Sequence, residues 1–154
     1  MLSTIVKPEY IQLKQEAHSF EEAIELAMSP LLKGGAVTQN YIEKVMEIYK
    51  ETGPYIVITK NVALPHAPTE YGALSTAMGI TTLNKPVKSG HETNDPVKYL
   101  FSLSAADGDK HLKALSELVT FLSNDQFLTM LDTATTKEEI INYIKKEEEN
   151  ERYA

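Results

Sequence analysis

The sequence predicts an α/β domain in which helices bracket a central block of strands. Apolar residues recur at helical spacing before residue 53 and again after residue 109. Between them lie short runs rich in β-branched and aromatic residues, separated by turn formers. The chain has 154 residues, 42% of them hydrophobic, which is enough for one sizeable core. We therefore expect residues 1–154 to form a single layered α/β domain.

Two amphipathic patterns in the first third of the chain predict helices. Ser19 and Glu22 form a capping-box pattern ahead of FEEAIELAMSPLL, residues 20–32. The stretch TQNYIEKVMEIYKETG, residues 38–53, places its apolar side chains on one stripe and closes on Gly53. We expect one helix after Ser19 and a second that ends at Gly53.

The middle of the chain predicts strands, and the last third predicts helices. The expected strands are YIVI (55–58), NVAL (61–64), LSTAMGITTL (74–83) and VKYLFSLSA (97–105). Leucines recur on one helical face from Asp109 onward, and Asp109 is the expected N-cap. A further helix is expected near Thr136, because Thr136 and Glu139 form a second capping-box pattern.

Composition excludes several classes of function. The chain carries 15 Lys and Arg against 22 Asp and Glu, a net charge of -7, which argues against nucleic acid as a partner. Because there is no cysteine, disulfides, thiolate metal sites and a cysteine nucleophile are excluded. No stretch approaches the roughly 20 apolar residues that span a bilayer. We expect a cytoplasmic protein without direct membrane insertion.

His66 is the first candidate for chemistry. It lies in NVALPHAPTEYG, residues 61–72, directly after an expected strand. Pro65 fixes the backbone before the ring, and Ala67 leaves little bulk beside it. This arrangement would present an imidazole at the end of a sheet. The alternative is a stiff loop that carries an incidental histidine.

His111 is the second candidate. In AADGDKHLKALSEL it falls in the first turn of the expected helix, where free backbone N–H groups favour an anion. Ligands of α/β folds bind at strand ends, so His66 and His111 could meet at one pocket. A phosphoryl group between two imidazoles is chemically plausible, because one can attack while the other donates a hydrogen bond. The alternative is that His111 is an ordinary surface residue.

Three segments resemble the mannitol/fructose-type enzyme IIA domain of the bacterial sugar phosphotransferase system, and the ascorbate-type branch most. They are TGPYIVITKNVALPHA (52–67), GHETNDPVKYLFSLSAADGDKHLKALSELVTFL (90–122) and TTKEEIINYI (135–144). The resemblance implies a mixed sheet sandwiched between helices. It also implies that His66 accepts a phosphoryl group from the histidine-containing phosphocarrier protein, with His111 in support. The next acceptor is a cysteine of the cognate enzyme IIB, which serves the membrane enzyme IIC, and no cofactor or metal is implied.

One position departs from the family pattern. Relatives often have a basic residue after Pro-His-Ala, where this chain has Pro68, and its only arginine is Arg152. The charge on a phosphoryl group would then be balanced by His111, by backbone N–H groups, by Lys60 or Lys110, or by a partner protein.

Two other functions stay open at this stage. The first is a regulatory relative, in which the phosphohistidine signals to another protein and no sugar is transported. The second is a metal-dependent hydrolase with His66 and His111 as ligands, although no third ligand stands at a short metal-binding spacing. For a transport role, L-ascorbate or a related sugar or polyol is expected. A homodimer is compatible with the sequence.

Overall fold

The fold is built on one mixed sheet of five strands. The computed structural model describes residues 1–153. The strands are β1 (Ile11–Gln15), β2 (Val57–Thr59), β3 (Val62–Ala63), β4 (Ala77–Val87) and β5 (Val97–Ser104). Their order across the sheet is β1-β4-β5-β3-β2. The pairs β1–β4 and β3–β5 are parallel, whereas β4–β5 and β2–β3 are antiparallel.

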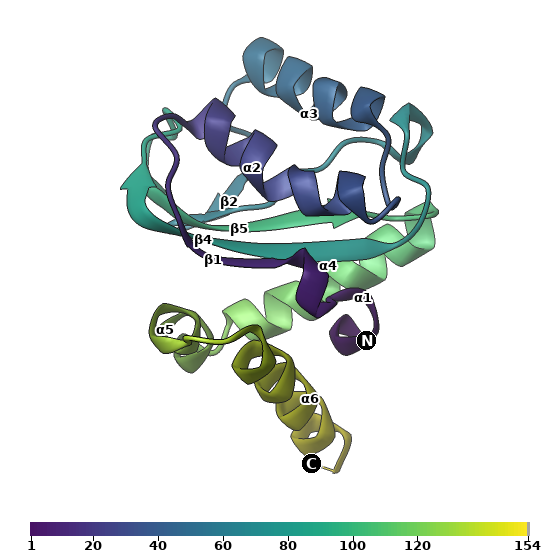
Figure 1. Cartoon of the computed structure of the whole chain (residues 1–154), viewed down its shortest axis with the longest axis vertical. Helices are drawn as coiled ribbons and strands as arrows, with labels where there is room; N and C mark the ends of the chain where they lie inside the picture. The colour runs from purple at the N-terminus through teal and green to yellow at the C-terminus, as the bar shows by residue number, and fades with distance from the viewer. Residues whose placement is uncertain (154) are drawn as a thin grey trace.

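Helices cover both faces of this sheet (Figure 1). The helices α2 (Phe20–Lys33) and α3 (Gln39–Thr52) lie on one face. The opposite face carries α1 (Leu2–Ile5), α4 (Gly108–Leu122), α5 (Asp125–Thr133) and α6 (Lys137–Tyr153). The predicted fold class, a mixed sheet between layers of helices, is confirmed.

Two apolar cores, one on each face of the sheet, explain the composition of the central strands. Alternate residues of a strand point to opposite faces, so Ala77 and Leu83 of β4 join the core under α2 and α3. Met78 and Ile80 join the core above α4, α5 and α6. Because both faces are covered, β4 and β5 read as nearly continuous buried runs.

The first predicted helix begins at its expected cap, Ser19, whereas the cap of α4 is shifted. Ser19 Oγ accepts a hydrogen bond from Glu22 N at 3.1 Å, as the capping-box pattern predicts. For α4 the expected N-cap Asp109 is wrong, and the cap is Asp107. Asp107 has the extended backbone of an N-cap, and its Oδ1 accepts from Lys110 N at 2.8 Å. Asp109 is already helical.

Several elements differ from the sequence expectation. The strand expected over 55–58 is displaced to Val57–Thr59, since the chain turns after Pro54. Strand β1 and helices α1 and α5 were not expected. Strand β1 lies at the edge of the sheet and lacks a clean alternation of buried and exposed residues. Helix α5 spans only nine residues, too few for a clear period.

Within residues 1–153, no helix is both long and apolar enough to cross a membrane.

The other two histidines of the chain are His18 and His91. His18 is exposed. His91 lies in a turn, where its Nδ1 accepts from the backbone N–H groups of Thr93 and Asn94 at 3.2 and 3.0 Å.

Gly79 of β4 offers a test of the packing between the sheet and α2. A Cβ on Gly79 would collide with Oγ of Ser102, its partner on β5, and would lie 3.1 Å from Leu31 Cδ1. We expect Gly79→Ala to lower the free energy of unfolding by about 1–3 kcal/mol, measured by urea denaturation. The Ser102 hydroxyl is buried without a hydrogen-bond partner. Adding Ser102→Ala should therefore restore part of the loss, and full additivity of the two changes would contradict this account.

Candidate active site

His66 follows strand β3 and lies at one end of the sheet. After β3 the chain stays anchored on both sides, because Leu64 N donates to Ile56 O at 2.7 Å and Pro65 O accepts from Leu103 N at 2.9 Å. The His66 backbone is therefore an extension of the sheet. Its side chain is half-buried.

His111 lies at the same end of the sheet, in the helix that follows strand β5. Because β3 and β5 are parallel neighbours, the segments that follow them leave the sheet together. The segment after β5 enters α4 at Gly108, and His111 lies one turn into that helix. The ring centroids of His66 and His111 are 5.3 Å apart, with 41° between the ring planes. The structure thus brings together the two histidines that the sequence analysis singled out.

The hydrogen bond of the His66 ring fixes its tautomer. Nδ1 lies 2.6 Å from the carbonyl oxygen of Leu64. A carbonyl oxygen can only accept, so Nδ1 carries the proton in this contact. In the neutral ring the lone pair is then on Nε2, which makes Nε2 the nucleophilic nitrogen.

His111 is biased toward its neutral form. Burial lowers the pKa of His111, and the charge of a protonated His66 nearby lowers it further. A neutral imidazole keeps one N–H group, which can donate to an anion. A negative group placed between the two rings would reverse the second effect and favour protonation of His111.

A cavity of about 700 Å³ opens beside the two rings. Its lining residues are Ile48, Thr52, Tyr55, Ile56, His66, Ala67, Pro68, Thr69, Gly108 and His111. The wall formed by the carboxyl end of α3 and the residues after it was not predicted from the sequence. Tyr55 at this wall is 82% exposed. The tyrosine in GPYIVI, residues 53–58, could have indicated this wall, but nothing in the sequence shows which cavity it would line.

The cavity lining contains no lysine or arginine among the described residues. Lys60 Nζ lies 3.1 Å from Asp95 O, so this ammonium group is held by another loop. Lys110 lines a separate cavity beside Met1 and Glu117. The polar groups left at the site include the His111 ring, the Tyr55 hydroxyl and the first N–H group of α4, at Gly108, which has no acceptor within the helix. The threonine hydroxyls of the lining already donate to backbone carbonyl oxygens.

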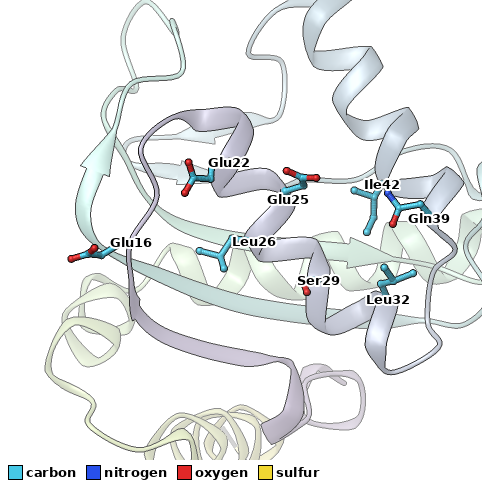
Figure 2. Close-up of a pocket in the computed structure, with 8 residues that line it drawn as sticks. All are labelled: Glu16, Glu22, Glu25, Leu26, Ser29, Leu32, Gln39 and Ile42. Carbon is cyan, nitrogen blue, oxygen red and sulfur yellow. The ribbon is translucent and has the colours of Figure 1, made fainter.

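A second cavity is lined mainly by residues of α2 and the start of α3 (Figure 2), and it shares no lining residue with the cavity beside the two rings. It measures about 390 Å³, and Glu16, Glu22 and Glu25 are among its lining residues. Leu26, Leu32 and Ile42 supply the apolar part of its lining, and Figure 2 shows Glu22, Glu25 and Leu26 together on α2. Carboxylates repel anions, so this cavity is a poor site for a phosphoryl group.

The described residues provide no ligand set for a metal. In that part of the chain no group of three or more His, Asp, Glu or Cys side chains is placed to hold an ion. His66 and His111 therefore lack a third protein ligand in this arrangement, and the hydrolase hypothesis gains no support from the geometry.

Comparison with known proteins identifies the family. Residues 4–147 match the family model "Phosphoenolpyruvate-dependent sugar phosphotransferase system, EIIA 2". The solution structure of the mannitol-specific cryptic phosphotransferase enzyme IIA CmtB from Escherichia coli is similar, with a TM-score of 0.83 and 34% identity over 93% of this chain and 97% of that one.

Two further proteins extend the comparison. The ascorbate-specific EIIA component of Escherichia coli K12 is 28% identical over 88% of this chain and 89% of its own length. Enzyme IIA of the Escherichia coli mannitol system, solved in complex with phosphorylated enzyme IIB, has a TM-score of 0.78 at 24% identity, covering 91% of this chain and 98% of that one. The chain belongs to the EIIA 2 family and is a phosphotransferase component of the sugar phosphotransferase system.

Proposed function

We propose that His66 is the phosphoryl acceptor of this carrier. The observation that carries the proposal is the hydrogen bond from Nδ1 to Leu64 O, which leaves Nε2 as the nucleophile beside the His111 ring. The donor is the histidine-containing phosphocarrier protein, and the next acceptor is a cysteine of the cognate enzyme IIB. Because this chain has no cysteine, its own acceptor is a histidine nitrogen, whereas the acceptor on enzyme IIB is a cysteine sulfur.

The reaction is an in-line displacement at phosphorus. A bond forms between Nε2 of His66 and the phosphorus atom, while the bond from phosphorus to the donor imidazole nitrogen breaks. In the second transfer a cysteine thiolate forms the new bond to phosphorus, and His66 leaves as the neutral imidazole. The protein contributes position and charge stabilisation.

The start of α4 and His111 stabilise the transferred group. The Gly108 N–H lies at the positive end of a helix of 15 residues, which favours phosphoryl oxygens. His111 supplies an imidazole N–H from one turn further along. Both groups line the cavity with His66, whereas Lys60 and Lys110 are turned to other sites.

We place the protein in the cytoplasm, where it serves a membrane enzyme IIC through enzyme IIB. The mannitol enzyme IIA with the same fold was solved with phosphorylated enzyme IIB. For the sugar we propose L-ascorbate or a related polyol such as mannitol, because similar proteins carry both specificities in their names. The carbon source whose uptake is lost when the gene is deleted would identify the sugar. Loss of gene regulation without loss of any uptake would favour the signalling role.

The assignment of His66 predicts a defined phosphorylation. Incubated with enzyme I, the phosphocarrier protein and phosphoenolpyruvate, the protein should gain one phosphoryl group that survives alkali and is lost in acid. His66→Ala should gain none, and His18→Ala, a change at an exposed histidine, should label normally. Undiminished labelling of His66→Ala in intact-mass spectra would rule out His66 as the acceptor.

The position of His111 predicts a pKa that depends on phosphorylation. In the free protein its pKa should lie below the usual 6.5, because the ring is partly buried and lies beside His66. Between 6.5 and the lower pKa of the folded protein, the unfolded chain binds more protons at this residue than the folded protein does. The contribution of His111 to stability should therefore fall as the pH drops from 6.5 through the folded pKa. A phosphoryl group on His66 should raise the pKa of His111. An NMR titration in which the His111 signals do not respond to phosphorylation would return it to an ordinary surface role.

The Gly108 N–H can be deleted without breaking a hydrogen bond of the helix. Gly108 is the first residue of α4 and follows an extended Asp107, so proline fits there and removes only this donor. We expect Gly108→Pro to slow phosphoryl transfer by about 100-fold while the fold is retained. Gly108→Ala, whose Cβ would meet no atom within 4 Å, keeps the N–H and should transfer normally. Equal rates for the two variants, measured by rapid quench, would count against this donor.

A further inference from the structure

The pairing of β3 with β5 continues past the end of β3 to His66. Val62 pairs with Tyr99 and Ala63 with Leu100 in parallel register. Three residues further along both segments, His66 stands opposite Leu103. In a parallel ladder, the N–H and C=O groups of one residue bond to the two neighbours of its partner. The first of these bonds is present, since Leu103 N donates to Pro65 O at 2.9 Å.

The second bond of this ladder step is replaced by a tyrosine hydroxyl. Ala67 N does not donate directly to Leu103 O but to the hydroxyl oxygen of Tyr41, at 3.0 Å. The same hydroxyl donates to Leu103 O at 2.8 Å. A longer contact of 3.1 Å joins it to Ala67 O, and its single proton serves the closer carbonyl. Tyr41 of α3 is therefore inserted between the loop of His66 and β5.

The bridge is buried and keeps its proton. Tyr41 is 1% exposed, Leu103 0% and Ala67 5%, so no water can readily take the place of the hydroxyl. Burial raises the pKa of Tyr41, which keeps the hydroxyl a donor. Without it, Ala67 N and Leu103 O would either stay unpaired or close directly on one another. The second outcome would pull the backbone after His66 toward β5.

We infer that Tyr41 is a positioning residue for the acceptor, which holds the His66 imidazole where Nε2 can attack the incoming phosphoryl group. The inference rests on the proposed role of His66. His66 lies between two anchors, the direct bond at Pro65 and the bridged bond at Ala67, and both anchors end on Leu103. Tyr41 sets the length of the second anchor and so the direction in which the ring leaves the sheet.

The test is Tyr41→Phe, which removes only the hydroxyl. We expect the maximal rate of phosphoryl acceptance from the phosphorylated phosphocarrier to fall by about 10-fold or more, because small displacements of a nucleophile slow transfer steeply. The carrier concentration at half-maximal rate should stay unchanged, since the buried Tyr41 contributes no surface for docking. The imidazole ¹⁵N signals of His66 and the amide signal of Ala67 should shift in the unphosphorylated protein. 4-Aminophenylalanine at position 41, which can both accept and donate, should restore much of the rate.

The matched control is Tyr49→Phe on the same helix. Its hydroxyl donates to Ser89 O at 2.8 Å, so this change also removes one tyrosine bond to the backbone, away from His66. All variants are compared below their melting temperatures. A normal rate and unmoved His66 signals in Tyr41→Phe would overturn the inference, as would equal losses of rate in the two variants. If the wild-type protein accepts no phosphoryl group, the proposed function fails, and the NMR signals still test whether Tyr41 positions the ring.

Discussion

The site depends on the parallel pairing of β3 with β5. Only two residues of β3 take part in the regular ladder, yet this short strand decides where the chain segments that follow both strands leave the sheet. Parallel strands end on the same side, so a loop histidine and a helix histidine become neighbours although 44 other residues separate them in the chain. An antiparallel pairing would have sent His66 and the start of α4 to opposite ends of the sheet.

A series of hydrogen bonds connects the sheet to Nε2 of His66, the proposed nucleophile. The ladder fixes Pro65, the Leu64 carbonyl fixes Nδ1 of His66, and the tautomer fixes which nitrogen keeps its lone pair. Each of these bonds uses a backbone group, so under this proposal the choice of nitrogen depends on the fold more than on neighbouring side chains. A nucleophile held in this way would be positioned before any partner arrives, which reduces the cost of ordering it at the moment of transfer.

How far the sequence predicts the structure depends on whether a feature is local. The pattern around Ser19 specifies a helix start within four residues, and the alternation of such local helix and strand patterns along the chain was enough to predict the fold class. The cap of α4 was placed at Asp109 because Asp107-Gly108-Asp109 offers two equivalent carboxylates, and only the backbone geometry distinguishes them. Tyr41 could not be found at all. Its apolar ring fits the buried stripe of α3, and its contacts with Ala67 and Leu103 join segments that are distant in the chain.

A cavity lining without lysine or arginine, as the described residues show it, is consistent with the task of a carrier. An intermediate that must be passed on should not be bound much more tightly than the transition state, since ground-state binding raises the barrier to the next transfer. An arginine fork would hold the phosphoryl oxygens of the resting phosphohistidine strongly. The backbone N–H groups at the start of α4 and a single imidazole N–H of His111 hold it less firmly than such a fork would. Extra positive charge can then come from the partner during transfer, when it lowers the barrier without stabilising the resting state.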